Sequence, residues 1–231
     1  MPTQEELPLL SAEMERRTPQ EILAWAAETY GNKLAMATAF GAEGCALIAM
    51  LASITNEAYL FNLDTGYQFP ETLELRQRLM DKYGITVHLV GAEESVPEME
   101  ARLGGPIYGK DPDLCCHIRK VVPLGKAIAG YKAWISAIRR DQSPARANAP
   151  IIGWDRKFQL VKVNPLANWT KTDVWNYILK NDVPYNPLHD QGYPSIGCWP
   201  CTRAVGAGEN DRAGRWAGFA KTECGLHVVN S

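Results

Sequence analysis

The sequence predicts an α/β fold with a Rossmann-like, mostly parallel sheet. Short apolar segments of strand length alternate with longer segments whose apolar residues follow helical spacing, and glycine-containing turns join the two kinds. The repetition of strand, turn and helix is typical of right-handed βαβ units. We therefore expect residues 18–163 to form one α/β core.

The first expected helix has signals at both ends. Thr18 is placed to cap its N-terminus, Pro19 suits the first helical position, and Glu21 completes a capping box. Apolar residues then recur at helical spacing over 22–30, and Gly31 follows as the stop signal. The sequence thus predicts a helix over 19–30.

The later elements of the core follow from the same alternation. Four buried strands are expected over 33–39, 57–63, 85–90 and 133–138. Helices are expected over 45–53, 70–83 and 172–180, the last of them beyond the core.

The last third of the chain has a different pattern. Residues 183–208 contain four glycines and four prolines with little periodicity, which predicts loops fixed by something other than a large core. Residues 219–231 are expected to form a mobile tail. We therefore divide this single domain into the core, a region over 164–218, and the tail.

Composition narrows the class of protein. The chain has 231 residues, of which 46% are hydrophobic and 22% charged, as in ordinary globular proteins. Its longest nearly apolar run, over 45–54, is about half the length of a membrane span. The acidic N-terminus lacks the pattern of a signal peptide. We expect a cytoplasmic protein that does not enter a membrane.

Charge is distributed unevenly behind the formal net charge of −2. Residues 1–114 hold 8 Lys or Arg against 18 Asp or Glu, a balance of −10, whereas residues 115–231 hold 16 against 8, a balance of +8. This asymmetry is consistent with an anionic partner for the basic half, or with two halves that neutralise each other. Long basic runs interleaved with aromatic residues are absent, so nucleic acid is not expected as a partner.

Four of the six cysteines have the spacing of a metal site. A disulfide framework is not expected in a cytoplasmic chain. Cys115, Cys116, Cys198 and Cys201 supply four thiolates from two distant segments, which suits structural zinc or an iron–sulfur cluster. The adjacent pair favours a cluster with irons at separate corners over one small tetrahedral ion. Free buried thiols or a thioredoxin-like Cys-x-Pro-Cys site are the alternatives, although no apolar strand precedes Cys198.

The other two cysteines lie in contrasting surroundings. Cys224 stands in a polar segment near the end of the chain, where Lys221 and His227 would favour its thiolate and Glu223 would oppose it. The alternative is an incidental surface cysteine. Cys45, within an apolar helix, is expected to be a small core residue.

Several segments have the composition of anion sites. Residues 40–44 lie between a strand and a helix, where backbone N–H groups point at an anion, and residues 64–66 follow the second strand. Arginines 139, 140 and 146 follow the fourth strand, and arginines 212 and 215 form a second pair. Guanidinium groups suit bidentate phosphate or sulfate contacts, although a basic cluster is also typical of a solvated face.

Together, these segments resemble assimilatory adenylyl-sulfate (APS) reductases, within the wider APS/PAPS reductase family. The resemblance covers residues 18–227. Leu63-Asp64-Thr65-Gly66 matches a substrate motif of the family. The other matching motifs are Cys-Cys-His-Ile-Arg-Lys (115–120), Arg-Arg-Asp-Gln-Ser-Pro (139–144), Asn-Pro-Leu (164–166), Gly-Cys-Trp-Pro-Cys-Thr-Arg (197–203) and Glu-Cys-Gly-Leu-His (223–227).

This resemblance implies an adenine-nucleotide α-hydrolase-like core that binds the nucleotide, and a [4Fe–4S] cluster held by Cys115, Cys116, Cys198 and Cys201. It implies that Cys224 is the nucleophile. The family's phosphate loop usually offers a serine and an acidic residue that this chain lacks, which leaves Thr38 as the substitute. The substrate-binding residues implied are Thr38, Phe40, Gly41, Leu63, Asp64, Thr65, Lys120, Arg139, Arg146, Arg212, Arg215 and His227.

The activity implied is the reduction of APS to sulfite and AMP through an S-sulfocysteine, with thioredoxin or a similar dithiol as reductant, in sulfate assimilation for cysteine biosynthesis. The resemblance also implies a homo-oligomer. Reduction of PAPS, alone or beside APS, is the nearest alternative. An ATP pyrophosphatase would need a Ser-Gly-Gly-x-Asp-Ser loop, which is absent. A non-enzymatic zinc module remains as a third possibility.

Overall fold

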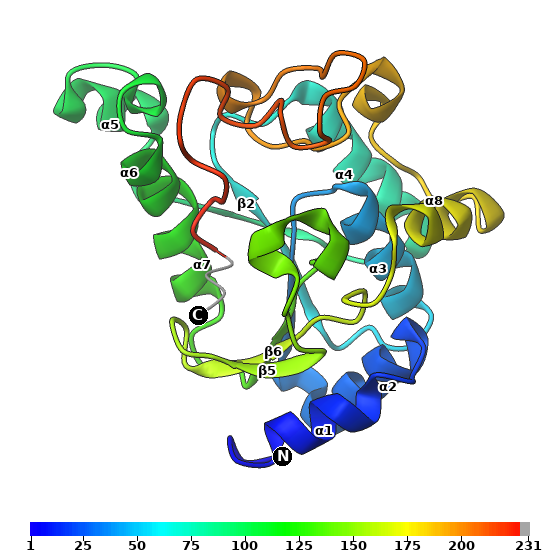
Figure 1. The fold of residues 1–231 in the computed structure, drawn as a ribbon. Helices are drawn as coiled ribbons and strands as arrows, with labels where there is room; N and C mark the ends of the chain where they lie inside the picture. Colours follow the sequence, from blue (N-terminus) through cyan, green and yellow to red (C-terminus); the bar gives the residue numbers. More distant parts are fainter. Residues whose placement is uncertain (227–231) are drawn as a thin grey trace.

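The computed structural model describes residues 1–226, and a six-stranded sheet lies at its centre (Figure 1). The strand order is β3-β2-β1-β4-β6-β5. All neighbouring pairs are parallel except β5 and β6, which are antiparallel. The predicted mostly parallel α/β sheet is therefore confirmed. The strands are β1 (Leu34–Thr38), β2 (Tyr59–Asp64), β3 (His88–Gly91), β4 (Ala133–Ile135), β5 (Ile152–Asp155) and β6 (Leu160–Val163).

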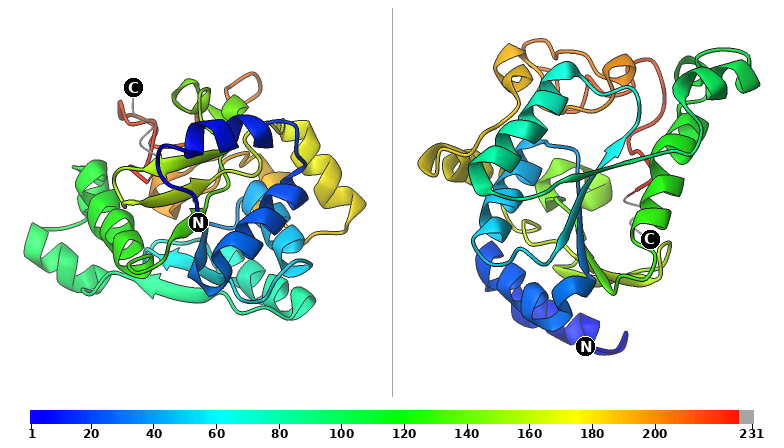
Figure 2. Two further views of the ribbon diagram at one scale, coloured as in Figure 1. Left: turned by 90° about the horizontal axis from the view of Figure 1, so that it is seen from below. Right: turned by 180° about the vertical axis from the view of Figure 1, so that it is seen from behind.

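Helices cover both faces of the sheet, as Figures 1 and 2 show. On one face lie α2 (Pro19–Tyr30), α3 (Ala42–Ala52), α4 (Pro70–Tyr83) and α8 (Lys171–Lys180). The larger apolar core fills the space between these helices and the sheet. The other face is covered by α7 (Val122–Ala127), which continues from α6 (Pro112–Cys116) through one π-helical turn, and here the core is smaller.

The predicted first helix is confirmed in detail. The Thr18 hydroxyl accepts a hydrogen bond from the Glu21 amide at 3.2 Å, and the Glu21 carboxylate accepts one from the Thr18 amide at 2.7 Å. The helix ends at Gly31, whose φ of +49° lies in the left-handed region that glycine adopts without strain. Both ends of α2 are therefore fixed by neighbours in the sequence.

The structure contains short elements that periodicity does not predict. These are α1 (Leu7–Met14), α5 (Val96–Leu103), α6, α7 and the hairpin of β5 and β6. No single helix or strand among them exceeds eight residues, so each is too short to show a full helical or alternating pattern. The fourth strand is also shorter than expected, because β4 ends at Ile135 and the chain then runs into irregular backbone.

The C-terminal region, residues 183–226, lies over the carboxyl ends of the strands (Figure 1). Its regular structure consists of two short 3₁₀ turns and one isolated bridge between Thr202 and Arg215, so the predicted loops are confirmed. The predicted mobility of the tail stays a prediction. Within residues 1–226 no helix has the length and apolar character needed to cross a bilayer.

Candidate active site

A cavity of about 330 Å³ opens where β1, β2 and β4 end. Because parallel strands place their carboxyl ends at one edge of a sheet, the turns that follow them meet there. The C-terminal region forms the opposite wall, including the segments around Cys198, Arg212 and Cys224. Segments far apart in the sequence therefore enclose one space.

The turn after β1 forms the floor of the cavity. The Thr38 hydroxyl accepts a hydrogen bond from the Phe40 amide at 3.1 Å, and Phe40 adopts a φ of +54°. A Cβ atom at Gly44 would lie 2.7 Å from the Thr38 hydroxyl, so only glycine allows α3 to begin this close to β1. This close approach brings Gly41 and the N-terminal turn of α3 to the cavity, where backbone N–H groups favour an anion.

Five of the predicted substrate cations line the cavity, and Arg139 is paired with two carboxylates of neighbouring segments. The Arg139 guanidinium contacts the Glu43 carboxylate at 3.0 Å and also the carboxylate of Asp141, and its side chain is only 6% exposed. These bonds join the start of α3 to the loop after β4. We interpret Arg139 as a brace between these segments. The other four cations are Lys120, Arg146, Arg212 and Arg215.

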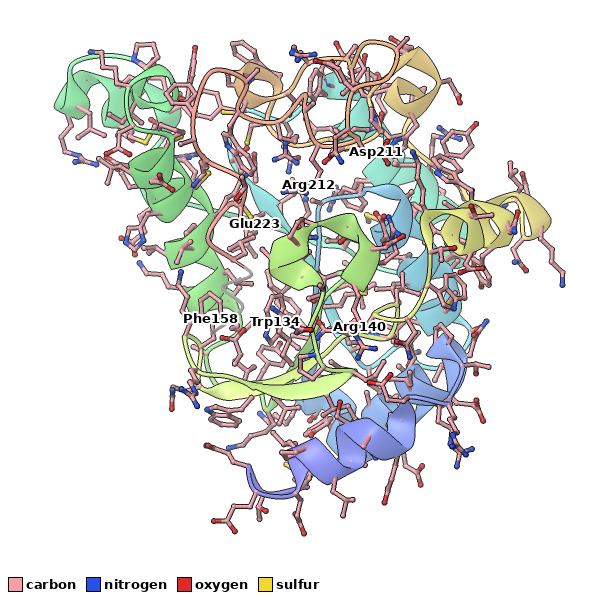
Figure 3. All side chains as sticks on the ribbon, viewed as in Figure 1. Trp134, Arg140, Phe158, Asp211, Arg212 and Glu223 are labelled. Carbon is pink, nitrogen blue, oxygen red and sulfur yellow. The ribbon has the colours of Figure 1, made fainter. Side chains whose placement is uncertain are left out.

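Arg146 and Arg212 share one carboxylate partner. The Glu223 carboxylate accepts two hydrogen bonds from Arg146, at 2.9 and 2.7 Å, and lies 3.4 Å from Arg212. Figure 3 shows Arg212 and Glu223 side by side above the sheet. The side chains of Arg146 and Glu223 are 8% and 16% exposed, so the pair is shielded from water. The residue next to the predicted nucleophile is thus bound to the predicted substrate cations.

Lys120 lies between this cavity and a second one. It belongs to the π-helical turn His117–Val121, in which the neighbouring Arg119 donates to the carbonyl oxygens of Thr65 and Glu94. Burial alone lowers the pKa of Lys120, but the electrostatic effect of the nearby Cys198, Cys224 and Cys116 side chains outweighs it, and the pKa is raised. Lys120 is therefore held as a cation. Its side chain lines both cavities.

The second cavity is lined by all four cysteines of the predicted metal site. Burial, with smaller electrostatic contributions from the neighbouring cysteines, raises the pKa of Cys115 to about 12. The Cys198 thiol donates a hydrogen bond to the Thr65 hydroxyl at 3.3 Å. Within residues 1–226, no three Cys, His, Asp or Glu side chains converge on a point where one ion would sit. The four sulfurs thus share a cavity without meeting at its centre.

The described part of the tail is fastened beside the predicted nucleophile, Cys224. The Thr222 carbonyl accepts a hydrogen bond from Arg212 at 2.7 Å, and the Gly225 carbonyl accepts one from Lys157 at 2.8 Å. Cys224, between these two anchors, is partly buried and lines the substrate cavity. Lys221, which we expected to favour the Cys224 thiolate, binds the carboxylate of Asp113.

Comparison with known proteins shows the family to which the chain belongs. The family model described as "Phosphoadenosine phosphosulfate reductase domain" matches residues 33–204. The chain belongs to this family. It is 47% identical to a phosphoadenosine 5'-phosphosulfate reductase from Gloeobacter violaceus, covering 95% of this chain and 92% of that one. It is 46% identical to adenosine 5'-phosphosulfate reductase 2 from Bacillus subtilis, covering 90% and 88%.

A solved structure of the same family has the same fold. The phosphoadenylyl-sulfate (PAPS) reductase from Candida auris, in a phosphate complex, superimposes with a TM-score of 0.77 at 33% identity. The match covers 89% of this chain and 98% of that one. The resemblance to APS/PAPS reductases is therefore confirmed.

Most of the residues that the sequence predicts to bind the nucleotide line the first cavity. Phe40 and Asp64 do not: the Phe40 side chain is buried in the core, and the Asp64 carboxylate accepts a hydrogen bond from the Gly66 amide. His227 lies outside the described residues. Cys45 is fully buried, as predicted. The lining residues are Thr38, Gly41, Leu63, Thr65, Lys120, Arg139, Arg146, Arg212 and Arg215.

The sequence did not predict the polar partners that orient the cavity walls. Ser136, which directly follows β4, donates to the Asn164 side chain, and Gln68 donates to the Asn62 side chain at 2.7 Å. The role of Glu223 was also missed, although it stands in the motif that contains Cys224. In the sequence alone, a glutamate before the predicted nucleophile indicates only a negative charge that opposes the thiolate. Its role as a partner of the arginines follows only from the structure.

Proposed function

We propose that the protein reduces adenylyl sulfate to sulfite and AMP, with Cys224 as the nucleophile and a [4Fe–4S] cluster as resident cofactor. One observation carries the proposal. Cys224 lines the same cavity as Lys120, Arg146, Arg212 and Arg215. A thiol that faces a set of cations at the carboxyl edge of an α/β sheet is placed to attack an anionic group of a bound nucleotide.

The first step transfers the sulfonyl group to the enzyme. The Cys224 thiolate donates an electron pair to the sulfur of APS, a new S–S bond forms, and the bond between sulfur and the bridging oxygen breaks. AMP leaves with the electron pair of the broken bond, because its phosphate stabilises the negative charge. The product is an S-sulfocysteine at residue 224.

The cations of the cavity allow this attack. A thiolate and a sulfate group repel each other, so Lys120, Arg146, Arg212 and Arg215 must offset the charge as they approach. In a pocket that excludes water, each contact of this kind contributes about 2–4 kcal/mol to the transition state. Burial lowers the pKa of Arg212, but a guanidinium remains charged throughout the neutral range.

The second step returns the thiol. One thiolate of a dithiol protein, thioredoxin or a relative, attacks the Cys224 sulfur and releases sulfite, which leaves a mixed disulfide. The second thiol of that partner then displaces Cys224 and closes the partner's own disulfide. The step requires that the partner's thiolate can reach the Cys224 sulfur, and Cys224 is partly exposed.

The four cysteines fit an iron–sulfur cluster by their chemistry. All four line one cavity, and they come from α6 and from the loop of the Cys-Trp-Pro-Cys motif. The adjacent pair Cys115 and Cys116 suits irons at separate corners of a cluster better than one small tetrahedral ion. When bound, the cluster would tie these segments together and set the charge beside Lys120. The predicted cytoplasmic location and homo-oligomer stay predictions.

Transfer of a labelled sulfonyl group tests the proposal. Anaerobically purified protein, incubated with ³⁵S-labelled APS, should carry the label on the peptide that contains Cys224, and a dithiol should release it as sulfite. Cys224→Ser should abolish both results and keep the visible absorbance of the cluster. The matched control is Cys45→Ser, at a fully buried thiol that does not line the cavity. Label on another thiol, or on none, would refute the assignment.

The same assay separates the two candidate nucleotides. Relatives of similar identity are named for APS in one case and for PAPS in another, so the family alone does not choose between them. We propose APS as the preferred substrate. Steady-state rates with each nucleotide test this choice, and a higher kcat/KM with PAPS would reverse it.

A further inference from the structure

The Glu223 carboxylate binds guanidinium groups that the proposed substrate needs for its own anionic group. Its Oε1 accepts from Arg146 Nε at 2.9 Å and from the Ser143 hydroxyl at 3.3 Å, and its Oε2 accepts from Arg146 Nη2 at 2.7 Å. Arg212 lies 3.4 Å from the same Oε2. A carboxylate therefore occupies a site formed by two guanidinium groups and a hydroxyl.

These contacts use one N–H on each nitrogen of the Arg146 guanidinium, and they fill the edge formed by its Nε and Nη2. Its Nε and Nη2 donate to Glu223, and its Nη1 donates to the Gln142 side chain at 2.5 Å. The edge formed by Nε and Nη2 binds carboxylate, phosphate and sulfate groups with the same forked geometry. An anion of the nucleotide can reach Arg146 through this edge only if Glu223 moves away.

The tail does not depend on Glu223 to stay in place. The backbone carbonyls on either side of Cys224 are held separately, Thr222 by Arg212 and Gly225 by Lys157. The Glu223 side chain can therefore leave Arg146 while Cys224 remains at the cavity. An exchange of anions at Arg146 requires a side-chain movement and leaves the nucleophile where it is.

We propose that Glu223 is a positioning residue that holds the anion site of the nucleotide-free enzyme and gives it up to an anionic group of the sulfonucleotide. This inference rests on the proposed function, since it assumes that the nucleotide enters this cavity. Glu223 keeps the buried guanidinium of Arg146 paired and oriented before binding, and it opposes binding as an internal competitor. Its removal should therefore tighten the binding of nucleotide anions and leave the binding of uncharged nucleosides unchanged.

Calorimetric titration of the anaerobic holoenzyme with AMP and with adenosine tests the proposal. Glu223→Gln should bind AMP about fivefold more tightly than the wild type, or better, because the competing charge is gone. Adenosine, which brings no anion, should bind both proteins equally. The matched control is Glu209→Gln. Glu209 lies outside the cavity and forms an exposed ion pair with Arg203 through two contacts of 2.8 Å each. The AMP affinity of this variant should equal that of the wild type.

Unchanged or weaker binding of AMP by Glu223→Gln would overturn the proposal. So would an equal gain for adenosine, because only a general change in the cavity moves both ligands. A crystal structure of the wild type with AMP gives a test that needs no variant. It should show the phosphate on Arg146 and Glu223 turned away, and bound AMP beside an intact pair of Arg146 and Glu223 would also overturn the inference.

The proposed function can fail separately. If AMP titrations behave as expected but no label reaches Cys224, the anion exchange stands and the assigned nucleophile falls. If the label reaches Cys224 and sulfite is released, but Glu223→Gln binds AMP as the wild type does, the reductase assignment stands and the exchange is refuted.

Discussion

The α/β core and the C-terminal region are stabilised in different ways. Between the sheet and its helices, apolar side chains such as Leu47 and Phe61 are completely buried. Residues 183–226 contribute only four buried apolar side chains, namely Val183, Leu188, Ile196 and Trp216. Ion pairs, turns and the bridge between Thr202 and Arg215 order the rest. The core thus folds by burial, whereas the region that completes the active site needs specific polar and, as proposed, cofactor contacts.

The largest effect is expected from removing a cysteine of the second cavity. Cys198→Ala should lose the iron completely, because the remaining three thiolates leave one corner of a cluster without a ligand. Limited proteolysis should then cut within residues 183–226 and spare the core, since the sheet does not need the cluster. Iron content and the masses of the fragments measure the two effects.

Cys45→Ala is the matched control for this experiment. Cys45 is a buried cysteine of α3 outside the second cavity. This variant should keep its iron and show the wild-type cleavage pattern. A Cys198→Ala protein with full iron content would contradict the proposed ligand set, and uniform cleavage of the core would contradict the separation between the two regions.

A large effect on stability is expected in the core. Phe61, on β2, is completely buried in the smaller core between the sheet and α7. Phe61→Ala should lower the free energy of unfolding by about 3–5 kcal/mol, because the lost side chain leaves a cavity in rigid surroundings. Urea unfolding followed by circular dichroism measures it. Phe219→Ala, at a 43% exposed phenylalanine of the C-terminal region, should change the same quantity by less than about 0.5 kcal/mol.

The smallest effect is expected at the start of α2. Thr18→Ala removes the side chain that accepts from the Glu21 amide, and it should cost about 1 kcal/mol of unfolding free energy. Thr86→Ala, at an exposed threonine of the loop between α4 and β3, is the control and should be neutral in the same urea titration. Equal losses in the two variants would show that the cap does not stabilise the fold.

The difference between the two regions explains what the sequence could predict. The core elements follow from local signals, as in the capping box of Thr18 and Glu21, and from periodic burial. The turn after β1 was expected to bind an anion, but the structure was needed to show that the Phe40 side chain belongs to the core. Cys224 was expected beside the substrate from its motif, whereas its anchors, Lys157 and Arg212, depend on long-range contacts that no local pattern records.

The carboxylates that line the active-site cavity have a consequence for selectivity. Six Lys and Arg side chains line it, together with four carboxylates, those of Glu43, Asp141, Asp211 and Glu223. A pocket of bare arginines would attract any small inorganic oxyanion from the surrounding solution, because a concentrated positive potential does not distinguish between them. Internal neutralisation removes most of that indiscriminate attraction. Free sulfate or phosphate would have to displace the Glu223 carboxylate without the binding energy of an adenosine group. The nucleotide-free site therefore stays available to a ligand that carries both an anionic group and adenosine.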